Sequence, residues 1–487
     1  MVLRRPLGSL ALLLVVIKSL QFAADSMPLF FFDSGAFILN GLGLAFIPER
    51  SYLYGYLLCR VSVPFGSLKP LVIAQVLLGG TTAWLLAFLL VRWFRVRTGI
   101  AALAALIFAF DPAQIVHERL VMAENLALFF IVLFLMSGLW YLRTKSHAWL
   151  VAASFFGIAL VATRFAYLPV VLVGSLSLPI IAHLRRREAD FRPLLAGLAT
   201  AAAATLVFHG AYRAWNGYLA GREPAYNYSS PVFLMSAVAP ILKPVDAADS
   251  RVATLIASLE TGPFKLSDRG SRGFHHWEPG GLNDGLMKIY GNDKVVVSRV
   301  AAALARRAIL RDPVGFLYLG LRSYWGHWRN LWGPIRFLRR EHGVTPEVQV
   351  TAIDAQVVRS RFGFDVENQN SLSTLSRRFH EWARRWILLS LLAPFLSLAA
   401  VWFVPTDQRR MAGYLAGWNC LLMAALSLGA DGTSYRYLHP YSFTGLLALS
   451  LLAEALWSRK PSGLRQEQSA RAQDSPVTGG MGSASRW

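Results

Sequence analysis

The side chains that could do chemistry in this chain are carboxylates and arginines at the borders of long apolar runs. A carboxylate there can act as a general base that takes a proton from a hydroxyl group. An arginine can bind two oxygens of one phosphate group. The residues of this kind are Asp33, Arg50, Glu118, Arg119, Glu124, Arg164 and Arg436, and Tyr437 follows the last arginine. Together they are suited to a reaction at a phosphorylated substrate.

Several of these residues also have a purely structural interpretation, which the sequence leaves open. Asp33 could cap a short helix that begins at the next residue. Glu124 could pair with Arg119 and only fix the start of a helix. Arg164 could reach lipid headgroups from within a membrane. Arg436 lies between two tyrosines, a combination typical of an anchor at the membrane interface.

The elements that must position these residues are predicted to be membrane-spanning helices. The chain has 487 residues, is 55% hydrophobic and is only 16% charged. A helix of about twenty apolar residues crosses a hydrocarbon core about 30 Å thick. The apolar runs of about this length are 6–24, 70–91, 99–116, 120–142, 148–165, 166–183, 193–212, 386–404, 411–429 and 438–457. We therefore predict an all-α polytopic transmembrane bundle of about ten spanning helices.

Basic residues in the links between the runs predict one orientation. They are Arg92, Arg95, Arg97, Arg143, Lys145, Arg185, Arg186, Arg187, Arg192, Arg409 and Arg410. Short cytoplasmic links collect such residues, so we expect a multi-pass protein of the cell (inner) membrane with a cytoplasmic N-terminus. The candidate residues then share the outer, periplasmic face. High alanine, leucine and arginine usage is typical of a bacterial source.

The predicted spans divide the chain into four parts. Residues 1–215 form a seven-helix transmembrane module that would hold the catalytic residues, and 216–384 form a long mixed extramembrane insertion between helices seven and eight. Residues 385–458 form a three-helix transmembrane part, and 459–487 form a disordered cytoplasmic tail.

The insertion has its own predicted pattern. Residues 295–311 have the spacing of an amphipathic helix that ends at Asp312-Pro313. Residues 313–328 are rich in aromatic residues and are typical of a helix in the membrane interface. If they cross the membrane instead, the orientation of all later spans across the membrane is reversed. Residues 262–293 are rich in Gly, Asn and Asp and are expected to be loop, with His275 and His276 solvated.

Other features exclude whole classes of function. The sequence has no Gly-Lys dipeptide and no Asp-x-Asp pattern, which disfavours an ATP-driven pump and a soluble sugar-nucleotide transferase. The two cysteines, Cys59 and Cys420, show no metal spacing. The net charge of +21 fits cytoplasmic loops and anionic lipids, and no nucleic-acid-binding motif accompanies it. We expect membrane lipids as partners, and neither nucleic acid nor a nucleotide or organic cofactor.

Several short motifs occur in a characteristic order along the chain. They are Asp33 with Ala36, Phe37, Asn40 and Gly41 after the first span; Arg119 five residues before Glu124; Thr163-Arg164 at a helix corner; Arg436-Tyr437 before the last span; and the segment 308–317. In these motifs the chain resembles the integral-membrane (C-type) glycosyltransferases, which include protein O-mannosyltransferases and the lipid A aminoarabinose transferase. The resemblance lies mainly in residues 1–215. The chain departs from the pattern in having Glu124, with Glu118 as a rival, where the family often has Asp.

The resemblance implies transfer of a sugar from a polyprenyl-phosphate carrier to an acceptor on the outer face. The acceptor would be a cell-envelope glycan such as lipopolysaccharide, a lipid or a protein. Asp33 would be the general base of an inverting displacement, and Glu124 would orient an arginine or help hold a divalent cation such as Mg²⁺ or Mn²⁺. The sequence defines no metal ligands. The implied substrate-binding residues are Arg50, Glu118, Arg119, Arg164, Arg436 and Tyr437.

Two other classes of function compete with this one. A transporter or flippase for a lipid-linked or anionic solute would use the same arginines but would not need Asp33 as a base. Essential acids in the middle of spans would favour it, and Glu124 and Glu454 are close to the ends of theirs. A structural assembly subunit would leave the cluster of acids and arginines on one face unexplained.

Overall fold

The regular structure of the protein is helical. The computed structural model describes residues 4–50, 52–184, 191–329, 352–366, 387–429 and 435–458, with a few positions between 375 and 382. In these ranges every named element is a helix, and the β-structure is one isolated parallel bridge between Leu29 and Leu120. The predicted tail, 459–487, lies outside the described residues.

In the part of the chain that the structure describes, seven helices are long and apolar enough to cross a membrane. They are α1 (Arg4–Ala24), α4 (Lys69–Arg92), α7 (Glu124–Thr144), α9 (Leu168–His183), α10 (Arg192–Ala220), α22 (Arg409–Gly429) and α23 (Pro440–Ser458). Three shorter apolar helices occupy the other predicted runs: α5 (Thr98–Ala109), α8 (His147–Thr163) and α21 (Ile387–Phe403). The prediction of a helical polytopic membrane protein is confirmed.

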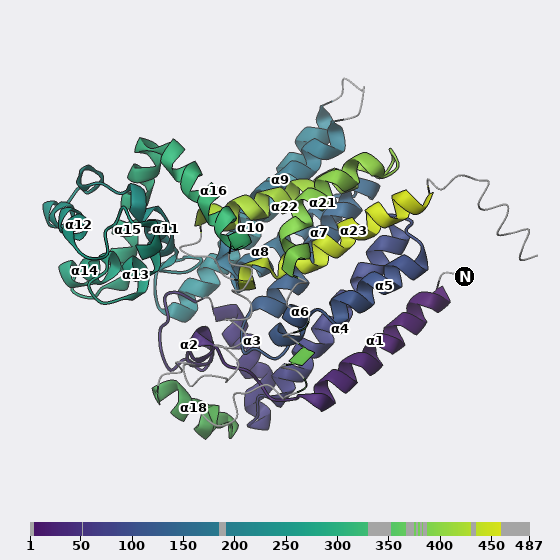
Figure 1. Ribbon diagram of the computed structural model, residues 1–487, viewed down its shortest axis with the longest axis horizontal. Coiled ribbons are helices and arrows are strands. Elements are labelled where there is room, and N and C mark those ends of the chain that lie inside the picture. Colours follow the sequence, from purple (N-terminus) through teal and green to yellow (C-terminus); the bar gives the residue numbers. More distant parts are fainter. Residues whose placement is uncertain are drawn as a thin grey trace, which may run out of the picture.

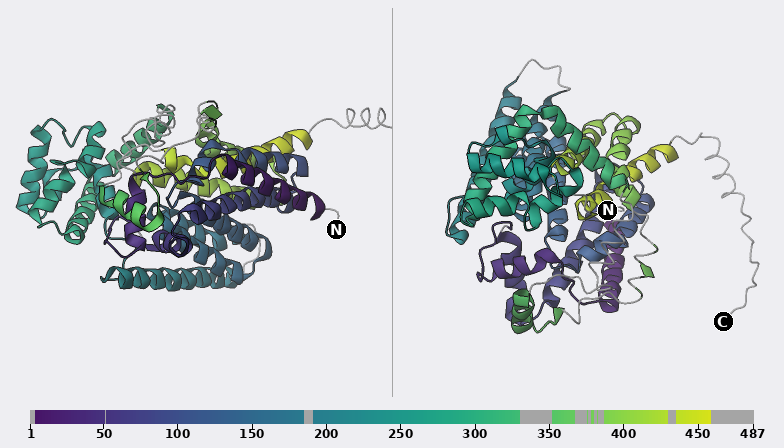
Figure 2. Two further views of the ribbon diagram at one scale, coloured as in Figure 1. Left: turned by 90° about the horizontal axis from the view of Figure 1, so that it is seen from below. Right: turned by 60° about the vertical axis from the view of Figure 1, so that its left-hand side comes forward.

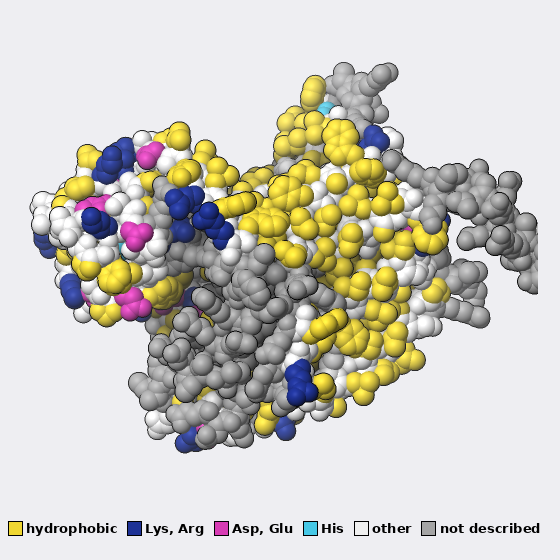
Figure 3. All heavy atoms as spheres, in the orientation of Figure 1, with side chains coloured by type: hydrophobic (Ala, Val, Ile, Leu, Met, Phe, Trp, Pro, Cys, Tyr) yellow, Lys and Arg dark blue, Asp and Glu magenta, His cyan; other side chains and the backbone are white. Residues whose placement is uncertain are grey.

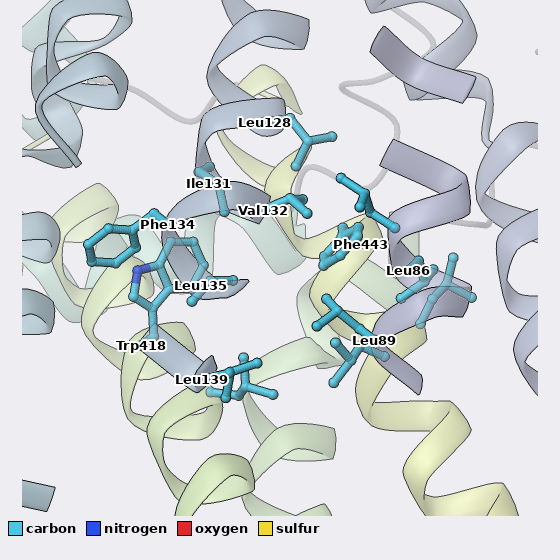
Figure 4. Close-up of a cluster of buried hydrophobic side chains, with 14 of the residues drawn as sticks. Leu86, Leu89, Leu128, Ile131, Val132, Phe134, Leu135, Leu139, Trp418 and Phe443 are labelled. Atoms are coloured by element: carbon cyan, nitrogen blue, oxygen red, sulfur yellow. The ribbon is translucent and has the colours of Figure 1, made fainter. Parts of the chain in front are cut away.

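Helix α7 is the centre of the bundle. Its side chains Leu128, Ile131, Phe134 and others pack against Leu86 of α4, Trp418 of α22 and neighbouring residues (Figure 4). The helix is apolar on all sides, which suits a position surrounded by other helices. Helices α4, α8, α9 and α22 pack around it.

The outer surface of the bundle is apolar. Figure 3 shows hydrophobic side chains spread over the bundle, whereas most of the charged side chains in this view gather on the insertion. Leu12 and Leu20 on α1 and Leu206 on α10 are among the exposed apolar residues. Such a wide apolar surface is unsuited to water and fits contact with lipid.

The insertion forms a second helical body at one end of the bundle, and the N-terminus lies at the other end (Figures 1 and 2). We call these the insertion end and the N-terminal end. The insertion contains α11 (Ser230–Val238), α12 (Ser250–Thr261), α13 (Arg272–Trp277), α14 (Leu282–Ile289) and α15 (Lys294–Arg311). Helix α15 confirms the predicted amphipathic helix, and α16 (Pro313–Arg329) follows it and packs against α22.

One prediction for the insertion is wrong. Residues 262–293 are not mainly loop, because they contain α13 and α14. Leu282 and Leu286 of α14 are fully buried in the core of the insertion. His275 and His276 are buried as well, so they are not solvated as expected.

Short helices at the insertion end close the bundle there. They are α2 (Phe32–Gly41), α3 (Tyr52–Ser62), α6 (Pro112–His117), α18 (Ala352–Phe362) and the 3-10 helices η2 (Phe165–Tyr167) and η7 (Tyr435–Leu438). Gly41 and Gly55 let α2 and α3 touch through their backbones, since a Cβ on Gly41 would lie 2.2 Å from the Gly55 carbonyl oxygen. The predicted run 99–116 is broken, because the Asp111 side chain caps a new helix that begins at Pro112.

Candidate active site

A cavity of about 310 Å³ lies at the insertion end, between the bundle and the insertion. We call it the site cavity. Its lining includes five residues that the sequence singles out: Asp33, Arg50, Glu124, Arg164 and Tyr437. Most of the remaining lining is apolar, including Phe37, Phe165, Pro169 and Leu426. The cavity thus combines charged groups with apolar walls.

Asp33 and Arg50 form one acid–arginine pair in the site cavity. Arg50 Nη2 donates to Asp33 Oδ1, and both side chains are mostly buried. Asp33 lies in the first turn of α2, where the helix dipole favours a negative charge. The helix begins one residue before Asp33, at Phe32, and Ser34 Oγ accepts a hydrogen bond from the Phe31 backbone N–H. The helix therefore begins two residues before Ser34, and Asp33 is not its N-cap.

Glu124 and Arg164 form the second pair. Arg164 Nη1 donates to Glu124 Oε1 across 2.8 Å, and the Glu124 side chain is only 4% exposed. Arg164 sits at the predicted corner, where α8 ends at Thr163 and η2 follows. Its guanidinium lies 5.4 Å from the centre of the Tyr437 ring. Glu124 therefore pairs with Arg164 and not, as the structural interpretation had it, with Arg119.

Arg119 lies outside the lining of the site cavity. Its guanidinium pairs with Asp25, and its Nε donates to the Met27 carbonyl oxygen across 2.9 Å. Burial lowers the pKa of Arg119 to about 10, although Asp25 opposes this shift. Next to it, Leu29 N–H donates to the Arg119 carbonyl oxygen and Val121 N–H donates to that of Leu29, each across 2.9 Å. Arg119 thus joins the segment after α1 to the segment before α7.

Glu118 also lies outside this lining, and its partner is one that the sequence did not indicate. Lys18, in the C-terminal half of α1, donates to Glu118 Oε1 across 2.7 Å, and both side chains are nearly inaccessible to solvent. Lys18 also donates to the Ala109 carbonyl oxygen at the end of α5. A lysine inside an apolar span is the signal that could have revealed this buried pair.

Gln114 is the centre of a buried network that sequence reasoning missed. Its amide nitrogen lies 2.9 Å from both Glu118 Oε1 and Asn125 Oδ1. Its amide oxygen lies 2.8 Å from His439 Nε2. Asn125 follows Glu124 in the chain, and His439 comes two residues after Tyr437. The network therefore connects the segment that carries Glu124 to the segment that carries Tyr437.

The insertion supplies one wall of the site cavity. Asn227, Ser230, Phe233 and Leu234, at or near the start of α11, line it. Phe233 packs edge-on against His276, which in turn stacks on Trp277. A further contact joins Lys294 of α15 to Glu49, at 3.3 Å, beside Arg50.

Two predicted features cannot be placed in this geometry. The side chain of Arg436 lies outside the described residues, although its backbone belongs to η7. In the described part of the chain, there is no group of three or more histidine, cysteine, aspartate or glutamate side chains that could hold a metal ion.

Part of the bundle that carries the site cavity is similar to a known protein family. Residues 73–195, which include Glu124 and Arg164, match the family of dolichyl-phosphate-mannose-protein mannosyltransferases. The resemblance to the integral-membrane glycosyltransferases is confirmed. No curated protein matches the chain in sequence.

Solved structures with a distant similarity include two of one protein. One is ArnT from Cupriavidus metallidurans bound to undecaprenyl phosphate, with 13% identity and a TM-score of 0.36, covering 91% of this chain and 77% of that one. The other is the same protein in the apo state, with 12% identity and a TM-score of 0.34, covering 91% and 78%.

Proposed function

We propose that this protein is a membrane glycosyltransferase that moves a sugar from a polyprenyl-phosphate carrier to an acceptor on the outer face of the membrane. The observation that carries the proposal is the presence of two acid–arginine pairs in one cavity with apolar walls. The donor class is also supported by the match over residues 73–195, because the matching family is named for a sugar on a lipid phosphate.

The site cavity suits such a donor physically. Arginine binds phosphate oxygens well, and Arg50 and Arg164 both line the cavity. The apolar walls suit the first isoprenoid units of the carrier. A volume of about 310 Å³ is at the small end of the range for ligand pockets, which is sufficient for a head group while the lipid chain stays outside.

The proposed reaction is a single displacement with inversion at the anomeric carbon. Asp33 accepts the proton of the acceptor hydroxyl as that oxygen bonds to the anomeric carbon. The bond from this carbon to the phosphate oxygen breaks, and the carrier phosphate leaves with the bonding electrons. Arg164, held by Glu124, offsets the charge that develops on the phosphate. Arg436, next to Tyr437, is the third candidate cation.

The pair between Asp33 and Arg50 has a consequence for the order of events. A carboxylate held by an arginine is a weak base, because the positive charge stabilises its ionised form. We propose that Arg50 turns from Asp33 to the donor phosphate when the donor binds. Asp33 would then become a stronger base only in the loaded site, which limits wasteful hydrolysis.

The experiment is transfer of radiolabelled sugar from polyprenyl-phosphate sugars by purified protein in liposomes. Wild type is compared with Asp33→Asn and with a matched control, Asp284→Asn, whose carboxylate lies on α14 in the insertion. We expect transfer with wild type and the control and none with Asp33→Asn. Transfer by a stably folded Asp33→Asn variant would contradict the assignment of the base. Binding of the lipid without turnover in all three proteins would favour a transporter or flippase.

A further inference from the structure

Two adjoining cavities lie at the N-terminal end of the bundle, remote from the site cavity. One is polar and the other apolar, and Arg410 at the start of α22 lines both. The described acids and arginines of the site cavity belong to the opposite end, so these two cavities need a separate explanation.

The polar cavity has a volume of about 270 Å³ and an excess of positive charge. Arg95, Arg143 and Arg410 line it together with one acid, Asp407. Arg95 pairs with Asp407 at 3.3 Å, but both side chains remain more than half exposed. Among the described residues Arg410 has no carboxylate partner. The cavity therefore suits an anion.

The backbone holds Arg95 at this cavity. Arg95 has a φ of +52°, a left-handed conformation that non-glycine residues rarely adopt. Its neighbours Phe94 and Val96 are both 3% exposed and anchor the strained turn in the bundle. Arg95 thus projects from a fixed position between α4 and α5.

The apolar cavity is a groove of about 430 Å³ between α9, α21 and α22. Leu184 and Trp402 line it and are 72% and 78% exposed. Gly413 on α22 also lines it, and no atom lies within 4 Å of the place where its Cβ would be. The groove is therefore open beside Gly413.

We propose that these two cavities form one binding site for an anionic phospholipid. The headgroup phosphate would lie among Arg95, Arg143 and Arg410, and an acyl chain would occupy the groove along Trp402. Basic pockets between spanning helices bind anionic headgroups, and tryptophan favours the level of the headgroups. An amphiphile matches this combination because the polar and apolar cavities share Arg410. A free phosphate ion would use only the polar cavity.

The experiment measures lipid binding to the purified, delipidated full chain by native mass spectrometry. The probes are phosphatidylglycerol, phosphatidylcholine with the same acyl chains, and inorganic phosphate. We expect wild type to prefer phosphatidylglycerol. The double variant Arg95→Gln/Arg410→Gln should weaken this binding about 10- to 30-fold, since each basic residue near a membrane surface contributes about 1 kcal/mol, or about fivefold. The matched control is Arg97→Gln, which removes an arginine at the same end of the bundle that pairs with Glu454.

A second variant tests the groove without removing charge. Gly413→Leu places a side chain in open space, so it should block the acyl chain without disturbing packing. Gly99→Leu on α5 is its control, because the space beside Gly99 is equally open. We expect Gly413→Leu to weaken phosphatidylglycerol binding and Gly99→Leu to leave it unchanged. Equal binding of the two lipids, an equal loss in Arg97→Gln, or full phosphatidylglycerol binding by Gly413→Leu would overturn the proposal. Inorganic phosphate that displaces the lipid at equal concentration would also overturn it.

Discussion

Leu29 and Leu120 form a parallel bridge, in which Leu29 makes one backbone hydrogen bond to each neighbour of Leu120. Each of the two leucines lies four residues before an acid of the site cavity. Asp33 follows Leu29, and Glu124 follows Leu120. Because the two segments are joined at this bridge, the positions of the two acids are coupled. Arg119 fixes the bridge through Asp25 and the Met27 carbonyl oxygen.

Arg119→Met should therefore lower both stability and transfer. The change leaves the carboxylate of Asp25, which is 9% exposed, without its cation. Breaking a buried ion pair from one side costs about 3–5 kcal/mol. Thermal unfolding in detergent measures the loss, and the double variant Asp25→Leu/Arg119→Met should recover part of the stability. Equal melting temperatures for wild type and Arg119→Met would show that the ion pair between Arg119 and Asp25 has no structural role.

Arg164 is expected to act mainly in the transition state. Replacing it by methionine should lower kcat by about 10²- to 10³-fold, the usual effect of losing one group that stabilises developing charge. Arg164→Lys should restore only part of the rate, because lysine cannot bind two phosphate oxygens in a planar arrangement. A change in KM alone, with kcat preserved, would place Arg164 in ground-state binding.

Glu124→Gln tests whether the carboxylate works through Arg164. If Glu124 only orients this arginine, the double variant Glu124→Gln/Arg164→Met should be no slower than Arg164→Met. Rates of all four proteins under single-turnover conditions give this comparison. Strictly multiplicative losses would mean that Glu124 has a separate role in the reaction.

Lys18→Met should destabilise the bundle strongly. It leaves Glu118 buried with its amide partner Gln114 but without a counter-charge. The expected cost is about 3–5 kcal/mol. Glu118→Gln in the same chain should reverse much of it, because a neutral amide no longer needs the lysine. Loss of stability in the double variant as large as in Lys18→Met would contradict this explanation.

The insertion should lose stability in acid. Burial alone would raise the pKa of Asp246, but hydrogen bonds from Arg311 and the Lys243 backbone outweigh it and lower the pKa below its ordinary value. A group with a depressed folded-state pKa stabilises the fold above its unfolded pKa, about 3.9, and this contribution is lost as the pH falls through the folded pKa. The protection factors for hydrogen exchange in α11 and α15 should therefore fall below about pH 4. In Asp246→Asn this fall should be smaller.

The sequence was sufficient to find most of the charged residues in the lining of the site cavity because they lie beside apolar runs. Asp33, Arg50, Glu124, Arg164 and Tyr437 come together in space as the predicted topology requires. The choice of ionic partners was not predictable. Arg119 is five residues before Glu124, but α7 begins only at Glu124, and Leu120 between them forms a bridge with Leu29. The arginine therefore turns to Asp25, which is far away in sequence.

The buried partners of Glu118 were missed for a related reason. Hydrophobic periodicity identifies the helix that contains Lys18 but not the element opposite it. The helices in 262–293 were missed because their many glycines and polar residues indicate loop, whereas Leu282 and Leu286 are held by packing against the insertion core. Tertiary contacts outweighed local propensity there.

The walls of the site cavity come from positions as far apart as Asp33 and Tyr437. A chain emerging from the ribosome therefore has no complete cavity until its last spanning helices have been inserted. The acid that we propose as the base is made early and remains without its full surroundings for most of biosynthesis. An unfinished or prematurely terminated chain would thus reach the membrane without the complete cavity in which we propose that the lipid-linked sugar reacts.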